Sequence, residues 1–318
     1  MKENNKQLGE WTPEEIKKYR SAIIQQRDCF DKYFHNQDEP YNLSFVYHYT
    51  TLDAFEKHIF PTDTLRFSNI AKFQEKGDSK EFILGFDLYK KKLNEIITNE
   101  KAKLFFNELL PSVDTISKTL FVLCLSTLQN NNEMYKNFSN TKSDKENERQ
   151  EGYSLEFDQS YFNYNFTDNL KSESSNRYLA NNHGLVIYSK HKQEEVIELS
   201  IRSLESMYND YYNKNIGEEE LKWFKSLFIH NLASILSFFK HEDFMEEQEY
   251  RYIVVGEGKD GFEHASFRKI DDTTVVLPIE ELWIDNENVT FCNIEKEFIK
   301  KHPRAIIQYN KNINLKKT

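Results

Sequence analysis

The sequence predicts an α+β fold, and two kinds of pattern carry this prediction. Short runs rich in β-branched and aromatic residues predict strands, beginning with 45–50. Longer stretches with apolar residues three or four positions apart predict helices, the longest at 79–110, 194–212 and 218–239. Strands and helices alternate irregularly and show no fixed-period repeat, which is typical of an α+β domain with helical insertions.

The N-terminal part begins with a strong helix signal. Thr12-Pro13-Glu14-Glu15 combines an N-cap, proline at the first helical position and a capping-box glutamate. We therefore expect a helical segment over residues 1–44, followed by a single α+β domain over 45–318. A short helix is expected at 52–59, ended by Pro61.

The rest of the domain is predicted to contain further strands, a polar loop and a helical insertion. The almost wholly polar stretch 129–150 predicts a solvated loop with one helical turn, and 192–241 predicts the helical insertion. The apolar run 121–126 predicts a buried strand. Other strands are expected at 65–68, 153–157, 185–189, 249–255, 275–277, 282–285 and 305–309.

Composition narrows the class of protein. The 318 residues carry a formal net charge of -10, so there is no global basic surface of the kind that drives non-specific nucleic-acid binding. No apolar stretch approaches the roughly 20 residues that span a bilayer, and the N-terminus lacks an apolar signal core. The 3 cysteines, Cys29, Cys124 and Cys292, are widely separated and are expected to be buried packing residues. We expect a cytoplasmic protein without membrane association.

Common catalytic motifs are absent from the sequence. It contains no G-x-G-x-x-G, P-loop, G-x-S-x-G or H-E-x-x-H motif. Its 9 histidines are scattered, without cysteines or carboxylates at metal-ligand spacing. No metal site is predicted.

Two strands carry the candidate site residues. In residues 244–255, FMEEQEYRYIVV, alternation places Glu247, Glu249 and Arg251 on one strand face. In residues 45–50, the same alternation separates His48 and Thr50 from Tyr47 and Tyr49. From the pattern alone, a solvated strand face with an ion pair worth under about 1 kcal/mol, and a packed or exposed histidine, are the favoured interpretations.

The order of several motifs resembles the bacterial family called domain of unknown function 2971. The quoted pieces run from about residue 45 to 290 and occur in the family's order. They are Tyr47-His48-Tyr49-Thr50, Leu65-Arg66-Phe67-Ser68-Asn69, Asp78-Ser79-Lys80-Glu81-Phe82, Leu123-Cys124-Leu125-Ser126, Gly152-Tyr153-Ser154-Leu155-Glu156-Phe157, Glu247-Gln248-Glu249-Tyr250-Arg251 and Pro278-Ile279-Glu280-Glu281-Leu282-Trp283-Ile284. The chain departs from the family's usual Asn-Asp-Pro at 77–79 and from its Met-Trp at Met134-Tyr135.

A second, weaker similarity is to ADP-ribosyltransferase-like folds, which begin with a His-x-Thr strand and use a late-strand glutamate. The matching positions are His48, Thr50 and Glu249, with Glu247 as an additional carboxylate and Ser126 as a loose match to a strand serine. This similarity implies an ADP-ribosyltransferase-like mixed sheet. It also implies NAD as the cofactor that is consumed.

The resemblance assigns roles that the chemistry supports. Breaking the nicotinamide glycosidic bond develops an oxocarbenium-like ribose, which Glu249 would stabilise, while Glu247 would orient or deprotonate the acceptor. His48 and Thr50 would fix the ribose. An aromatic ring, from Tyr49, Tyr135 or Tyr252, would stack on nicotinamide, and Arg251 or Arg66 would meet the pyrophosphate.

The resulting hypothesis is NAD-dependent transfer of ADP-ribose to a macromolecule, which is either a protein or a nucleic acid. The reaction would serve bacterial conflict or phage defence, and the chain would have a partner protein from such a system. It requires the strands of His48 and Glu249 to be neighbours and both side chains to open into one cleft. Two alternatives stay open. One is a non-catalytic nucleotide-sensing or interaction module, and the other is a metal-dependent nuclease or hydrolase using Glu247, Glu249 and Asp78.

Overall fold

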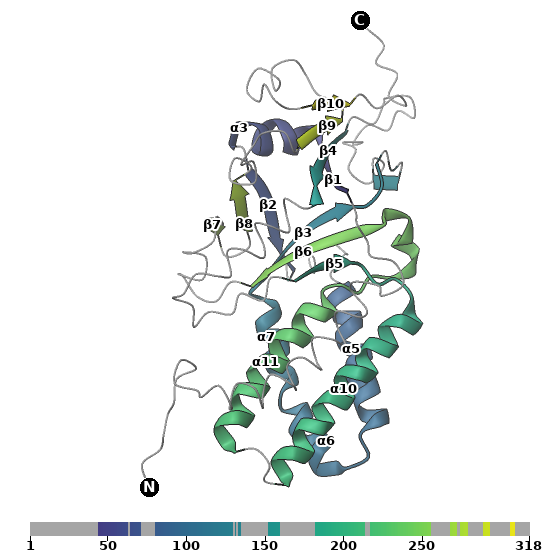
Figure 1. Cartoon of the computed structure of the whole chain (residues 1–318), viewed down its shortest axis with the longest axis vertical. Helices are drawn as coiled ribbons and strands as arrows, with labels where there is room; N and C mark the ends of the chain where they lie inside the picture. The colour runs from purple at the N-terminus through teal and green to yellow at the C-terminus, as the bar shows by residue number, and fades with distance from the viewer. Residues whose placement is uncertain are drawn as a thin grey trace, which may run out of the picture. The chain divides into compact units, whose positions relative to one another are not determined.

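The structure is a computed structural model of the chain (Figure 1). It describes residues 44–62, 64–70, 80–129, 131, 133–134, 152–159, 182–213, 217–255, 268–271, 274–278, 289–292 and 306–308. The predicted N-terminal helix, the strand expected at 282–285 and most of the predicted polar loop lie outside these residues. The chain divides into two compact units. Unit 1 comprises Met1–Tyr41, Ile70–Leu120 and Ser174–Glu242, and unit 2 comprises Asn42–Asn69, Phe121–Glu173 and Asp243–Thr318.

Unit 2 is built on a sheet whose strands come from distant parts of the sequence (Figure 1). Along the main path the strand order is β10-β9-β4-β1-β3-β2-β8-β7, and β6 also pairs with β3. The strands are β1 (Phe45–Thr51), β2 (Thr64–Asn69), β3 (Leu120–Ser126), β4 (Gly152–Asp158), β6 (Glu249–Val255), β7 (Arg268–Asp271), β8 (Thr274–Pro278), β9 (Val289–Cys292) and β10 (Ile306–Gln308). β9 and β10 are parallel, whereas β1 is antiparallel to both β3 and β4.

The centre of this sheet is covered on both faces. In β1, Val46 on one face is fully buried and Tyr49 on the other is 2% exposed. β3 buries Leu123 and Leu125, as its continuous apolar run predicts. Most side chains in the middle of the sheet are therefore withdrawn from water on either face, although His48 and Cys124 are only half-buried.

Helical turns join β1 to β2. These are α2 (Leu52–Ala54), the π-helical turn η2 (Phe55–Ile59) and α3 (Phe60–Thr62). The predicted short helix is thus present, but Pro61 lies inside its last turn instead of ending it.

Unit 1 contains the long helices. They are α5 (Lys80–Ile96), α6 (Glu100–Asn107), α7 (Leu110–Ser117), α10 (Lys190–Tyr212) and α11 (Glu218–Leu236), together with strand β5 (Asn182–Leu185). Helix α10 packs against α5 and α11, and α11 packs against α7. The side chain of Ser189 caps α10 by accepting a hydrogen bond from the backbone N–H of Lys192, and Asn99 caps α6 in the same way. Buried Leu93, Phe106, Val113, Ile201 and Leu232 form part of the core.

The predicted α+β class is confirmed, and the stretch predicted as a helical insertion, 192–241, contains most of α10 and all of α11. The strand expected at 185–189 instead spans Asn182–Leu185, and β7 and β9 were not predicted. Both are only four residues long, and β7 is also polar, so neither run is long enough to give a clear strand signal. Among the described helices, none combines the length and apolarity that crossing a membrane requires.

Candidate functional site

The Tyr49 side chain connects strand β1 to the chain that follows β3. Tyr47, Tyr49 and Met134 form a buried group on one face of β1. The Tyr49 hydroxyl donates a hydrogen bond to the carbonyl oxygen of Leu128 at 2.6 Å and accepts one from the backbone N–H of Asn131 at 2.8 Å. The chain that follows β3 is therefore tied to β1.

Asn131 and Ser126 tie the same segment to residues 246–247. The Asn131 amide accepts hydrogen bonds from the backbone N–H groups of Glu133 and Met134 and donates one to the carbonyl of Glu246 at 2.8 Å. The Ser126 hydroxyl donates to the carbonyl of Glu247 at 2.8 Å. Asn131 is 7% exposed and Ser126 fully buried, so breaking these contacts would leave unpaired polar groups.

Gln248 lies between the two glutamates and has a left-handed backbone, with φ of 45°. Its carbonyl accepts a hydrogen bond from the backbone N–H of Thr127 at 2.9 Å, and its own N–H donates to the carbonyl of Met245. A non-glycine residue in this conformation is strained, and such strain clusters at functional sites. The turn at Gln248 ends the 3₁₀ helix η5 (Glu242–Glu247) and starts β6.

Glu249 and Arg251 form a buried ion pair on β6. A guanidinium nitrogen of Arg251 lies 2.9 Å from a carboxylate oxygen of Glu249, and the two side chains are 3% and 2% exposed. The neighbouring guanidinium favours the charged form of a buried carboxylate. Removing two charges from water is costly, so such a pair is weak evidence of a role in stability.

Ser154 and Glu156 extend the polar cluster onto β4. They pair with Tyr49 and Tyr47, and paired residues share a sheet face. Glu156 is 4% exposed and accepts a hydrogen bond from the side-chain amide of Gln129 at 3.1 Å. The fully buried Ser154 hydroxyl has no hydrogen-bond partner among the described residues. We call Tyr49, Ser126, Ser154, Glu156, Glu249 and Arg251 the polar cluster.

His48 occupies the other face of β1. Its Nδ1 lies 3.3 Å from the carbonyl oxygen of Cys124, to which only a protonated nitrogen can donate. Burial lowers the pKa of His48 to about 4, and the hydrogen bond to Cys124 offsets part of this effect. His48 is therefore a neutral imidazole near pH 7. Cys124 is half-buried, whereas the sequence predicted it to be buried.

The tyrosines of β6 show which face Glu249 occupies. The side chain of Gln159 hydrogen-bonds Tyr250 and Tyr252, and its backbone N–H donates to the carbonyl of Ser44. Gln159 thus continues the face of β4 that lies beside His48. Alternation then places Glu249 and Arg251 on the Tyr49 face.

The structure corrects several sequence-based expectations about this site. β3 lies between β1 and β6, so the strands of His48 and Glu249 are not neighbours. Their side chains lie on opposite faces, and Glu249 is buried instead of opening into a cleft. Glu247 ends η5 and is half-buried, because the turn at Gln248 interrupts the alternation that was expected to carry it onto the strand.

The predicted site residues therefore separate into groups. Tyr49, Ser126, Glu249 and Arg251 belong to the polar cluster. Thr50, buried on the His48 face, and exposed Arg66 on β2 lie outside it, whereas Tyr135 lies outside the described residues.

Asn131, Ser154 and Glu156 were missed. Asn131 stands in a polar run that predicts a solvated loop, and Ser154 and Glu156 alternate with apolar residues as on a solvated strand face. Ser154 and Glu156 are revealed only by their position in a sheet covered on both faces, and Asn131 only by its burial and its hydrogen bonds to Tyr49 and to the carbonyl of Glu246.

The described residues show no group of three histidines, cysteines or acids that could hold a metal ion. Asp78, required by the metal-dependent alternative, lies outside them. That alternative stays a prediction.

One comparison with known proteins gives a match. Residues 134–252 match the family model described as Protein of unknown function (DUF2971), which confirms the predicted family resemblance over this segment. Neither the curated proteins nor the solved structures contain a match to the chain, so similarity to ADP-ribosyltransferase folds stays a prediction. The matched segment includes Ser154, Glu156, Glu249 and Arg251 of the polar cluster.

Proposed function

We propose that unit 2 binds a nucleotide, NAD, at the polar cluster, and that it transfers ADP-ribose from NAD to a macromolecular acceptor. The observation that carries the proposal is the buried Glu249–Arg251 pair beside the strained Gln248. Neither feature favours folding, and both are typical of sites where charge and geometry serve chemistry.

The proposed reaction needs a fixed carboxylate. As the bond between ribose and nicotinamide breaks, the electron pair leaves with nicotinamide and positive charge develops on the ribose. A carboxylate held beside the ribose stabilises that charge, most strongly where water is excluded. Arg251 keeps Glu249 charged and oriented. In this proposal Glu247, at the cluster's edge, assists the acceptor, and His48 does not touch the ribose.

Access to Glu249 requires a local opening. The carboxylate side chain is 3% exposed, and Leu128 and Asn131 are tied to Tyr49 and to the carbonyl of Glu246 by hydrogen bonds. Each such bond contributes about 1 kcal/mol net. Ligand binding that replaces these bonds is therefore energetically feasible.

The test is release of nicotinamide from NAD by the whole chain. Glu249→Gln keeps the size and an acceptor oxygen for Arg251 but removes the charge, so turnover should fall about a hundredfold or more, mainly in kcat. Glu247→Gln should reduce transfer while slow hydrolysis to free ADP-ribose persists. Exposed Glu246→Gln is the matched control and should behave as wild type. Equal turnover in wild type and Glu249→Gln would reject the transferase proposal.

A second candidate, a nucleotide-binding module without turnover, is favoured by one observation. The Glu249 carboxylate is engaged by Arg251 and nearly inaccessible. This candidate predicts that NAD raises the Tm of the whole chain without release of nicotinamide. No shift of Tm and no turnover at millimolar NAD would reject both candidates.

A further inference from the structure

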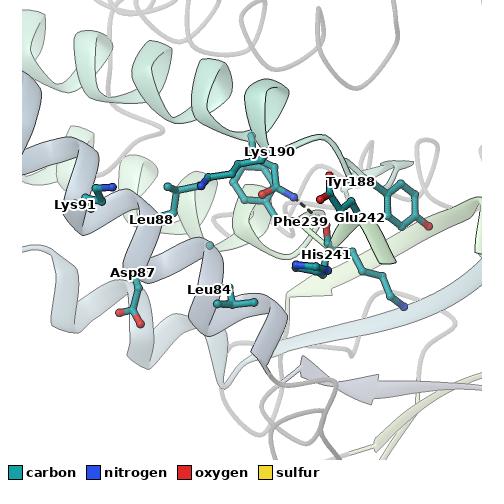
Figure 2. A pocket seen from close by; sticks show the side chains of 12 residues that line it. Leu84, Asp87, Leu88, Lys91, Tyr188, Lys190, Phe239, His241 and Glu242 are labelled. Atoms are coloured by element: carbon teal, nitrogen blue, oxygen red, sulfur yellow. Dashed lines mark hydrogen bonds between the residues drawn. The ribbon is translucent and has the colours of Figure 1, made fainter. Parts of the chain in front are cut away.

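Unit 1 contains a cavity of about 410 Å³, which no part of the proposed NAD chemistry uses. Its walls come from α5, the first turn of α10 and the chain after α11 (Figure 2). This volume is in the range of pockets that hold small organic ligands. The apolar part is formed by Leu84, Gly85, Leu88 and Phe239.

In the apolar part of the cavity, Leu84 is exposed to solvent, whereas Gly85 packs closely against Phe239. Leu84 is 50% exposed, whereas Phe239 is 2% exposed. A Cβ added at Gly85 would lie 3.1 Å from a ring carbon of Phe239. Because glycine has no Cβ, α5 can approach Phe239 closely. This contact forms the apolar floor of the cavity.

Three lysines (Lys91, Lys190 and Lys240) and two acids (Asp87 and Glu242) line the cavity, a small excess of positive charge in a chain whose net charge is -10. Figure 2 shows the ammonium groups of Lys91 and Lys190 directed toward the region of Leu88, whereas the carboxylate of Asp87 points away. Glu242 lies at the other end, beside Tyr188. Lys91 also lies 3.9 Å from a carboxylate oxygen of Glu95 on the exposed side of α5, so the excess of positive charge at the end of the cavity near Leu88 comes chiefly from Lys190.

The neighbouring acids of α10 are already engaged. Lys92 lies 3.0 Å from a carboxylate oxygen of Glu194 and 3.3 Å from one of Glu198. The pKa of Glu194 is lowered chiefly by its hydrogen bond with Lys92, and the charges of Lys190 and Lys91 lower it further, so this carboxylate partly offsets the positive charge of both lysines. These contacts hold α5 against α10.

We propose that this cavity binds a small amphiphilic anion, with an apolar body against Leu84, Leu88 and Phe239 and an acidic group near Lys91 and Lys190. The apolar floor favours burial of a short hydrocarbon chain, and the two ammonium groups supply the complementary charge.

The probe is decanoate below its micelle concentration, titrated calorimetrically into the whole chain, with decyltrimethylammonium as the cationic probe of equal chain length. Decanoate should bind at one site and raise the Tm, and the cation should bind at least tenfold more weakly. Equal binding of both probes, or no binding of decanoate at millimolar concentration, would overturn the proposal.

Matched variants locate the binding. Leu84→Trp should fill the cavity and abolish binding, while Leu104→Trp, on the exposed side of α6, should bind as wild type. Lys190→Gln should weaken decanoate binding about fivefold by loss of one partly solvated charge interaction. Lys101→Gln, in the first turn of α6 and outside the cavity, should not. Unchanged binding by Leu84→Trp, with its fold verified by circular dichroism, would reject this cavity as the site.

Discussion

The buried pair of Glu249 and Arg251 makes the sharpest prediction at the scale of single residues. Arg251→Leu would leave the Glu249 carboxylate buried without its guanidinium, which should cost about 3–5 kcal/mol of unfolding free energy. The double variant Glu249→Leu/Arg251→Leu should recover most of this loss, because no charge stays buried. Urea unfolding of the wild type and the variants measures both effects. An Arg251→Leu protein as stable as the wild type would show that the pair is solvated.

His48 should make stability depend on pH. Its pKa is about 4 in the folded protein, below the ordinary value of 6.5, because burial disfavours the charged imidazole. Between these values the unfolded chain binds the proton and the folded one does not, so stability falls as pH falls from about 6.5 to 4. The loss is at most about 3.5 kcal/mol, since one pKa unit is worth about 1.4 kcal/mol. His48 is only half-buried, which makes the full value an upper bound.

The comparison variant is His48→Gln, which cannot titrate. Urea midpoints measured at pH 7, 5.5 and 4.5 should fall more steeply for the wild type than for this variant, since the carboxylates contribute equally to both. Parallel pH profiles would mean that His48 does not have the lowered pKa.

The sequence could identify these residues but not their surroundings. Glu249, Arg251 and Tyr49 were expected in the site, and they belong to the polar cluster. The sequence favoured a solvated position for the ion pair, because alternation alone cannot tell a solvent-facing strand from one covered on both faces. His48 was placed beside Glu249 by resemblance, and the strand order separates them.

At the scale of helices and strands, Gln248 determines how η5 is joined to β6. Its φ of 45° ends η5 and sets the direction in which β6 begins. Gln248→Gly and Gln248→Ala both remove the side-chain hydrogen bond to Met245, so their difference isolates the backbone strain. The glycine variant should be more stable than the alanine variant by about 1 kcal/mol. Thermal or urea unfolding of this pair is the measurement, and equal stabilities would show that the left-handed backbone is not required.

The turn at Gln248 also explains why the bounds of β6 were easier to predict than the faces on which its side chains and that of Glu247 lie. The bounds of β6 agree with the predicted strand 249–255, because its aromatic and β-branched residues give a strong signal. Extending the same alternation to Glu247 was wrong, because nothing in the sequence marks Gln248 as left-handed. Asparagine or glycine there would have given that signal.

At the scale of the whole molecule, strand order was beyond the reach of sequence patterns. β1 lies between β3 and β4, although β2 follows it in the chain, and β6 joins the other strands only after the long helices of unit 1. Such pairings depend on which apolar faces cover one another, and local periodicity does not record this. The fold class was predictable because it depends only on the kinds of elements and their sequence.

Because strands from distant parts of the sequence pair with one another, we predict that the segment matching the family model does not fold alone. Residues 134–252 contain β4 and most of β6 but lack β1 and β3, the strands that lie between them. Leu155 and Phe157 of β4, both almost fully buried in the whole chain, would be exposed, and β4 would lose its pairing with both β1 and β9. The isolated segment should therefore show no cooperative urea transition and no near-UV circular dichroism, whereas the whole chain should show both. A sharp transition in the fragment would mean that its strands find partners among themselves, and the polar cluster would then have to form without Tyr49 and Ser126.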